Sequence, residues 1–405
     1  MKRAGPHRAP ASGVAAFLLA VGAGFLHLCP APLSAQSVAS GYGFGAPLEA
    51  LGSRALALGG IGMGLTGTEL NPQDPAAAAD VVLPAIFVTS QTSWADVTEA
   101  GQASDFTTTR FPSLGLIYPF AGVGTFMLSF TGVLDQTWRT SEERLLTLEG
   151  SGTQARVTDF FQSEGGVSAL QVGYARRISP RLAVGVTAGS YIGTLTRTFR
   201  RSFDSLEVET DVPDFVVGGT WNYEGFFGTV GATWEVSDIA RLSGSFSLGG
   251  ELEGDPTEST DGARLLVQMP NEYRVGGTVL LAEGLNLSAG VLYADWADAG
   301  GDVPGVEGTT VLKLGGGVEF TGARILGKGA ALRFGYRNGD LPFRRAGDPE
   351  VSESAFTGGL GLNLLEGQDV LLARSDFTLE RGSRDAGVFE EDFWRLSVTI
   401  RVSGF

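Results

Sequence analysis

Three glycines near the N-terminus have the spacing of a phosphate-binding loop. Gly62, Gly64 and Gly67 form a G-x-G-x-x-G pattern after an apolar run, and Asp80 follows 18 residues after Gly62. In dinucleotide-binding folds such glycines admit a pyrophosphate to a helix N-terminus, and the acidic residue binds the ribose. Here "NPQDP" comes next, and its two prolines would stop that helix. Only strand-like segments follow, so we interpret the glycines as a compact, turn-rich segment and expect no cofactor.

The first 35 residues are predicted to be a secretory signal peptide. Lys2, Arg3 and Arg8 precede the apolar run "GVAAFLLAVGAGFLHL", and "PLSA" places a small residue, Ala35, before Gln36. A basic start, an apolar centre of this length and a small residue at the cleavage position are typical of export signals. We therefore expect an exported protein.

Cleavage would leave a mature chain without imidazole or thiol groups. His7 and His27 are the two histidines, and Cys29 is the one cysteine. A disulfide, a Cys/His metal site and a His-dependent general base are thereby excluded. A Ser–Lys pair would depend on Lys313 or Lys328, so we expect no enzyme and no metal centre. The net charge of −16 also argues against nucleic acid as a partner.

From about residue 83 the chain alternates apolar and polar residues with a period of two. In "LRFGYRN", Leu332, Phe334 and Tyr336 would face one side of a strand, and Arg333 and Arg337 the other. Turn residues divide this pattern into fourteen predicted strands, near 84–95, 108–120, 122–137, 164–178, 181–197, 219–236, 239–249, 270–282, 284–297, 309–322, 327–339, 353–365, 368–381 and 391–405.

The connections alternate between short turns and long polar loops, which is typical of outer-membrane barrels. The predicted fold is an all-β, transmembrane antiparallel β-barrel over residues 83–405. Five tryptophans, Trp94, Trp138, Trp221, Trp296 and Trp394, fall at the long-loop ends, as an interfacial belt would place them. The charged residues in mid-strand are expected to face a wet lumen: Arg333, Arg337, Arg374, Asp376, Glu380, Arg395 and Arg401. The alternative is a soluble secreted sandwich or propeller, which also alternates.

A fourteen-stranded barrel is wide enough to leave a hole unless something fills it. Residues 36–82 precede the first strand and are rich in glycine and alanine, so they are expected to form an N-terminal plug. The predicted plug residues are Gly62, Gly64, Gly67, Asn71 and Pro72.

Several segments resemble the FadL/TodX family, the outer-membrane transporters of long-chain fatty acids and other hydrophobic compounds. The hairpin "MPNEYRVGGTVLLAEGLNLSAGVLYADW", from Met269 to Trp296, looks like a recurring hairpin of that family. The segment around Asn71 and Pro72 resembles its N-terminal signature, although Gln73 stands where the family usually has Ala. The resemblance implies a fourteen-stranded barrel closed by an N-terminal plug.

Two features suggest where a hydrophobic ligand could be admitted. The loop 138–163 carries an apolar set, Leu145, Leu146, Leu148, Phe160 and Phe161. An exposed patch of this kind often marks a binding site, but these residues could equally pack under the loop or extend the strands. Gly132, in "SFTGVLD", is a candidate kink that would bend the third strand and open a lateral gap.

Two loops are strongly acidic. One carries Glu251, Glu253, Asp255, Glu258 and Asp261, and the other carries Asp204, Glu207, Glu209, Asp211 and Asp214. Calcium is one possible ligand, although no loop has EF-hand spacing. Solvation and divalent bridging to lipopolysaccharide is the interpretation we favour.

The predicted function is passive uptake of small hydrophobic molecules, fatty-acid-like or aromatic, by a monomer in the outer membrane of a Gram-negative-type cell. The alternative is a structural or secretion-associated barrel that binds partner proteins without transporting solutes. The lumen distinguishes the two. A continuous apolar tunnel past a displaceable plug favours transport, whereas a lumen sealed by pairs such as Arg374 with Asp376 or Glu380 favours a scaffold.

Overall fold

The computed structural model describes residues 38–41, 44–67, 71–99, 102–147, 154–203, 213–260, 262–300, 306–367, 370–387 and 389–405. The elements below belong to one compact unit, which begins at Ser34 and runs to Phe405. The predicted signal peptide lies outside the described residues. In the described part of the chain, no helix is long and apolar enough to cross a bilayer.

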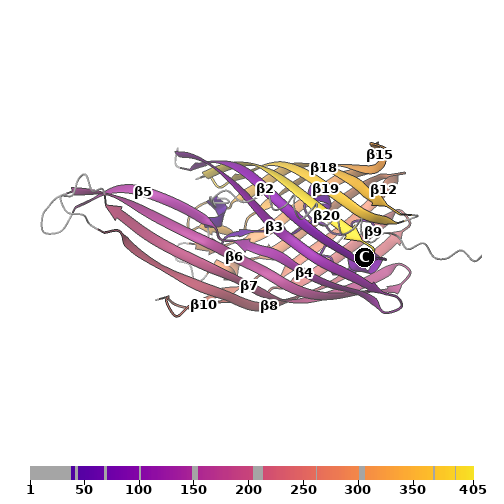
Figure 1. The fold of residues 1–405 in the computed structure, drawn as a ribbon, viewed down its shortest axis with the longest axis horizontal. Coiled ribbons are helices and arrows are strands. Elements are labelled where there is room, and N and C mark those ends of the chain that lie inside the picture. The colour runs from indigo at the N-terminus through magenta and orange to yellow at the C-terminus, as the bar shows by residue number, and fades with distance from the viewer. Residues whose placement is uncertain are drawn as a thin grey trace, which may run out of the picture. The chain divides into compact units, whose positions relative to one another are not determined.

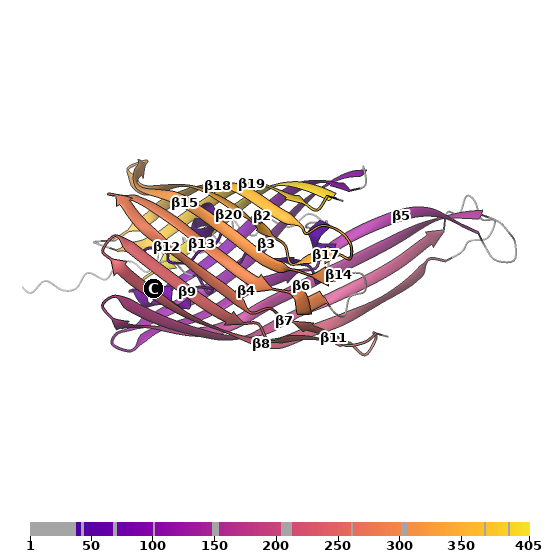
Figure 2. The same cartoon turned by 180° about the vertical axis from the view of Figure 1, so that it is seen from behind.

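Fourteen antiparallel strands of the described chain form a closed ring, in which β20 pairs back onto β2 (Figures 1 and 2). In order around the ring they are β2 (Ala85–Glu99), β3 (Gln102–Phe120), β4 (Gly124–Asp135), β6 (Gln154–Ser179), β7 (Leu182–Phe203), β8 (Phe215–Ser237), β9 (Ala240–Leu248), β12 (Glu272–Ala282), β13 (Leu285–Asp295), β15 (Thr310–Ile325), β16 (Lys328–Asp340), β18 (Ser352–Glu366), β19 (Leu371–Asp385) and β20 (Phe389–Ser403). The predicted antiparallel barrel of fourteen strands is confirmed.

The alternating sequence positions the two faces of the barrel wall. On β16, Leu332, Phe334 and Tyr336 are exposed on the outside, whereas Arg333 and Arg337 are buried on the inside. The same division recurs around the ring, so the outer surface is largely apolar and the lumen is polar. This is the arrangement that a bilayer-spanning barrel requires.

Several predicted loops contain further strands. They are β5 (Trp138–Thr147), β10 (Glu251–Pro256), β11 (Leu265–Gln268), β14 (Val306–Gly308) and β17 (Phe343–Arg345), with the short helix η3 (Ala297–Gly300). β5 pairs with the outer part of β6, from Trp138 opposite Ser163 to Thr147 opposite Gln154. The prediction of a loop over 138–163 was therefore wrong for most of its length. Of its apolar residues, Leu145, Leu146, Phe160 and Phe161 belong to a hairpin that prolongs the wall, because the alternation continues past the barrel rim.

The tryptophans do not all form a belt. Trp94 and Trp394 are 42% and 45% exposed and lie opposite each other on β2 and β20, as expected for the bilayer interface. Trp296 is only 5% exposed, and its ring lies 5.3 Å from that of Phe343. Its assignment to the belt was wrong, because it follows the end of β13 and packs inward against β17.

The N-terminal segment, described over residues 44–67 and 71–80, contacts both sides of the ring. It contains β1 (Ala46–Pro47), α2 (Ser53–Ala57) and η2 (Pro75–Asp80), and η1 (Val38–Gly41) precedes it. The helix α2 packs on β16, β18, β19 and β20, whereas η2 packs on β4, β6, β7 and β8. These two groups of strands are separate arcs of the barrel, so the segment spans from one arc to the other.

Candidate functional site

A chain of ion pairs joins α2 to the lumen wall. Arg54 donates two hydrogen bonds to Glu319 on β15, at 2.9 and 2.6 Å. Glu319 also accepts one from Arg333 at 2.8 Å, and Arg333 donates to Asp376 at 2.7 Å. Arg374 lies 3.0 Å from the second oxygen of Asp376. Charges are seldom buried without partners, and here each guanidinium faces a carboxylate.

A second network surrounds Glu49. Its carboxylate lies 3.2 Å from Arg337, 3.3 Å from Lys313 and 3.9 Å from Arg395. Burial alone would raise the pKa of Glu49, but the charges of Arg337 and Lys313 outweigh burial and lower the pKa. Glu380, on β19, pairs with Arg337 and Arg395.

The structure therefore brings six of the seven predicted lumen charges into these two networks. Arg401 instead borders a cavity of about 350 Å³, which Arg54, Glu319, Arg374 and Asp376 also line. The sequence prediction did not identify residues of the N-terminal segment as partners of these lumen charges. Glu49 and Arg54 are isolated charges in an otherwise apolar, glycine-rich stretch, which is a signal that could have identified them.

Two carboxylates of the segment face the opposite arc. Asp80 pairs with Arg177 and, at 2.5 Å, with Arg241. Asp74 is 1% exposed and accepts hydrogen bonds from the backbone N–H of Gly64 and the hydroxyl of Ser243. Burial raises the pKa of Asp74, against the lowering effect of these two hydrogen bonds.

The three glycines of the G-x-G-x-x-G pattern have a conformational role in this segment. Gly62, Gly64 and Gly67 have φ angles of +71°, +66° and +79°, which favour glycine. A Cβ at Gly64 would lie 2.8 Å from the carbonyl oxygen of Gly276 on β12. Asn71 donates to the carbonyl of Gly62 at 2.9 Å and thereby closes the glycine turn on itself.

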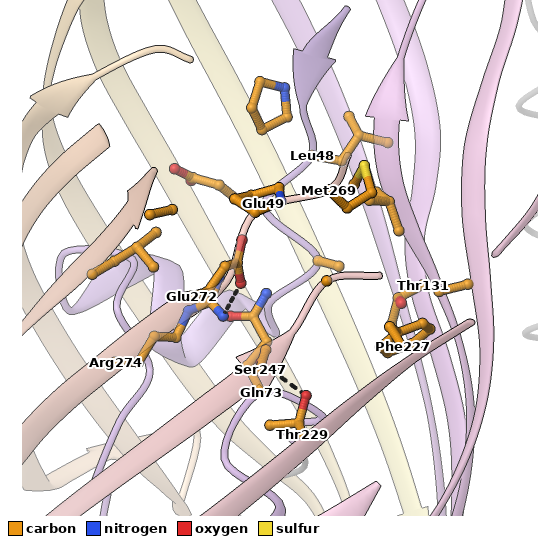
Figure 3. Close-up of a pocket in the computed structure, with 18 of the residues that line it drawn as sticks. Leu48, Glu49, Gln73, Thr131, Phe227, Thr229, Ser247, Met269, Glu272 and Arg274 are labelled. Carbon is orange, nitrogen blue, oxygen red and sulfur yellow. Dashed lines mark hydrogen bonds and ion pairs between the residues drawn. The ribbon is translucent and has the colours of Figure 1, made fainter. Parts of the chain in front are cut away.

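A cavity of about 160 Å³ lies between the N-terminal segment and the wall (Figure 3). Pro72, the remaining predicted plug residue, borders it. Its polar boundary includes Glu49, Gln73 and the ion pair of Glu272 with Arg274, 2.5 Å apart. Most of its lining is apolar: Leu48, Leu51, Ile61, Val133, Tyr191, Phe227, Met269, Leu292, Trp296 and Val311. We call this space the lumen cavity.

Next to the lumen cavity, two neighbouring strands separate. β3 pairs with β4 only between Ser113–Thr131 and Phe120–Gly124. At that level the register of β2 and β3 shifts around Pro112, and that of β4 and β6 shifts after Gly132. Proline lacks an N–H donor, and bulges bend strands, so both features favour separation. We call the interval between β3 and the β4–β5 stretch the seam.

The seam is bordered from within by the N-terminal segment. β1 pairs with β4, placing Pro47 opposite Leu134. A Cβ at Gly132 would lie 2.5 Å from the Cδ1 atom of Leu48. Arg110 of β3 reaches across to Asp135 of β4, at 3.7 Å. Gly132 therefore lies where the cavity, the segment and the seam meet.

The residues predicted to admit ligands do not form one surface. The ring of Phe161 lies 5.0 Å from that of Phe199, tilted by 44°. Phe161 also borders an outer groove of about 290 Å³, which Trp138 and Trp221 line as well. Phe160 lies beneath the guanidinium of Arg200, on the opposite face of β6, because side chains alternate along a strand.

The leucines of that set lie elsewhere. Leu145 is 61% exposed, and Leu146, its neighbour on β5, is partly buried. Neither lines the outer groove, and Leu148 lies outside the described residues.

The acidic connections are partly described. Ligand oxygens of Glu224, Glu253 and Asp255 lie within 4.8 Å of one another. Arg264 pairs with both Glu253 and Asp255, which supplies a positive charge beside the cluster. Asp261 and residues 204–212 lie outside the described residues, whereas Asp214 lies 3.9 Å from Arg200.

Comparison with solved structures identifies the fold. A FadL homologue of Pseudomonas aeruginosa shares 12% identity with a TM-score of 0.60, covering 90% of this chain and 100% of that one. The toluene transporter TodX of Pseudomonas putida shares 14% identity with a TM-score of 0.55, covering 88% and 98%. At such identities the likeness concerns the fold, which is of the FadL/TodX type. No curated protein sequence matches this chain. The profile of the family described as BamG matches residues 17–226, just over half of the sequence, and the chain therefore belongs to that family.

Proposed function

We propose that the protein admits small hydrophobic molecules of aromatic-ring size through the outer membrane. The single observation that carries this proposal is the mostly apolar lumen cavity beside the seam. An engineered apolar cavity of about 150 Å³ binds benzene, so the lumen cavity of about 160 Å³ has the volume for one ring. A long acyl chain would need the segment to move.

In this proposal the N-terminal segment acts as a plug with two differently held sides. The ion pairs of Glu49 and Arg54 fasten it to the arc that begins at β15. Against β4, β6 and β8 the lumen cavity is lined by uncharged side chains, among them Val133, Ala169 and Phe227. Asp80 pairs with Arg177 of β6, but neither residue lines the cavity. Passage is diffusion from the outer groove to the lumen cavity, and Gly132 is the proposed kink beside a lateral opening.

The chain works as a monomer without catalysis, and the acidic residues of β10 face lipopolysaccharide.

A cavity-filling substitution tests the proposal. Ala169 is 2% exposed on β6 and lines the lumen cavity, so Ala169→Phe would occupy that space. The neighbouring Leu170 is 47% exposed on the outer face, which makes Leu170→Phe a matched control. In liposomes carrying the purified protein, uptake of labelled toluene should fall about tenfold for Ala169→Phe and stay unchanged for Leu170→Phe. Equal uptake by the two variants would refute the route.

The second candidate is a barrel that holds a partner protein and conducts nothing. The pairing of Arg374 with Asp376, and of Glu380 with Arg337 and Arg395, favours it, because these charges close one side of the lumen. Under this candidate, liposomes with the unaltered protein would take up toluene no faster than empty liposomes.

A further inference from the structure

The outer half of β3 has a strand partner on one side only. Residues Ala103–Thr109 pair with β2, and pairing with β4 begins at Ser113. Within the described residues, no backbone hydrogen bond reaches Ala103–Thr109 from the side of the seam. Such an edge presents a row of N–H and C=O groups and is a template for another strand.

This edge carries little of the usual protection against pairing, because Asp105 is its one charged residue. Its sequence "ASDFTTT" has neither proline nor lysine, and Thr107, Thr108 and Thr109 are β-branched. Across the seam, β5 carries Glu142, Glu143 and Arg144, charges of the kind that discourage edge pairing. Of the two edges, β3 is therefore the better acceptor.

The outer face of this edge is polar. Phe111, 52% exposed, is the outermost large apolar side chain on the bilayer face of β3. Beyond it, the exposed positions of the strand are small or polar, including Ser104, Asp105 and Thr107. A partner could therefore approach without entering the bilayer.

The seam already accepts an extended segment on its other side. β1 of the N-terminal segment pairs antiparallel with β4, and Leu48 donates a hydrogen bond to the carbonyl of Val133 at 2.9 Å. That pairing covers only two residues of β1. It leaves the outer half of β3 without an equivalent strand.

An acidic pair indicates the charge of the missing partner. Asp105 lies directly opposite Asp96 of β2, and both are exposed on the outer face. The next strand brings Asp392 opposite Asp96, but Asp392 pairs with Arg381 at 2.6 Å. No described residue forms an ion pair with Asp96 or Asp105. Like charges directly opposite each other destabilise a sheet, so a cation beside Asp105 would relieve the repulsion.

We propose that Ala103–Thr109 receives an extended strand of another polypeptide, which places a lysine or arginine beside Asp105. Backbone pairing supplies the affinity, and the acidic pair supplies the preference for a basic residue. This interaction surface goes beyond the proposed passage of small molecules and does not depend on it.

Hydrogen exchange with a defined peptide tests the inference. The probe is a short synthetic peptide that alternates valine and threonine around a central lysine, added to the full protein in detergent. Amides of residues 103–109 should exchange fast in the free protein and become protected at saturating peptide. A matched peptide with glutamate in place of lysine should bind about fivefold more weakly, and an N-methylated version should not bind.

Charge reversal supplies the matched controls. Asp105→Lys should invert the preference between the lysine and glutamate peptides. Asp298→Lys, at an exposed acid in η3, should leave the preference unchanged. The proposal is overturned if residues 103–109 are already protected without peptide, if the peptide protects none of them, or if calcium alone binds the acidic pair. Because toluene uptake is not the readout, this test and that of transport can fail separately.

Discussion

At the scale of single residues, buried ion pairs join the N-terminal segment to the barrel. Glu319 is 2% exposed and bridges Arg54 of the segment and Arg333 of the wall. Removing one member of such a buried group leaves uncompensated charge, which costs more than the pair contributes when whole. The segment should therefore be sensitive to single neutral substitutions at these positions.

Glu319→Gln should destabilise the contact of α2 with the wall by about 3 kcal/mol, because Arg54 would lose its carboxylate. The effect would be measured as the rate at which a protease cleaves the N-terminal segment in the folded, detergent-solubilised protein. Urea unfolding of the whole protein would serve as the comparison. Asp238→Asn is the matched control, because Asp238 is 97% exposed in a pair with Arg181. That change should cost less than about 1 kcal/mol. A contradiction would be equal protease resistance of Glu319→Gln and the unaltered protein.

Glu49 gives the segment a predictable response to acid. Because its pKa is lowered in the folded protein, its charge stabilises the fold above the ordinary carboxyl pKa of about 4.3. That stability is lost as pH falls through the lowered pKa. Glu49→Gln should therefore be less stable at neutral pH and lose less stability on acidification.

Asp74 should behave in the opposite sense. Because the pKa of Asp74 is raised in the folded protein, its contribution to the stability of the fold declines as pH rises above the ordinary pKa of about 3.9. Urea midpoints of the Glu49→Gln and Asp74→Asn variants across this range would separate the two groups. Parallel pH profiles of Glu49→Gln and the unaltered protein would contradict the role of Glu49.

At the scale of elements, the alternation of the sequence predicted all fourteen barrel strands, because one face meets lipid and the other a polar lumen. It did not predict where the strands end. The strand expected over 164–178 runs from Gln154 to Ser179, since β5 continues to pair with it beyond the rim. Alternation also predicts the face of the strand on which a charged residue lies, but it does not predict the ion-pair partner of that residue. The pairing of Arg54 with Glu319 joins residues 265 positions apart and depends on register.

Gly165 is the residue on which the prolonged β6 depends. Its φ is +119°, and a Cβ there would lie 1.9 Å from the carbonyl oxygen of Thr194 on β7. Gly165→Ala should destabilise the protein by about 1–3 kcal/mol from backbone strain alone, with the steric overlap adding to it. Gly358→Ala is the control, because nothing lies within 4 Å of its Cβ position. Guanidinium unfolding of both variants would measure the difference, and equal midpoints would rule out the constraint.

At the scale of the whole molecule, a fourteen-stranded wall encloses contacts of two kinds. The arc from β15 to β20 holds the N-terminal segment by the ion pairs of Glu49 and Arg54, and Asp80 pairs with Arg177 and Arg241 on the other side. Beside the seam, β4, β6 and β8 border the mostly apolar lumen cavity. Charged contacts are directional and resist sliding, while apolar contacts tolerate small displacements. The proposed route for hydrophobic molecules therefore lies on the apolar side, between the segment and the seam.

A reversible lock at Gly132 tests this account most directly. The Cβ of Leu48 lies 3.6 Å from the position of a Cβ at Gly132, within the range of a disulfide. The sequence has one cysteine, Cys29, in the predicted signal peptide, so Leu48→Cys with Gly132→Cys would form an unambiguous pair. Liposomes with the oxidised double variant should take up labelled toluene about tenfold more slowly than liposomes with its reduced form. The uptake rate of each single variant should not depend on the redox state. Equal uptake by the oxidised and reduced forms would contradict the account.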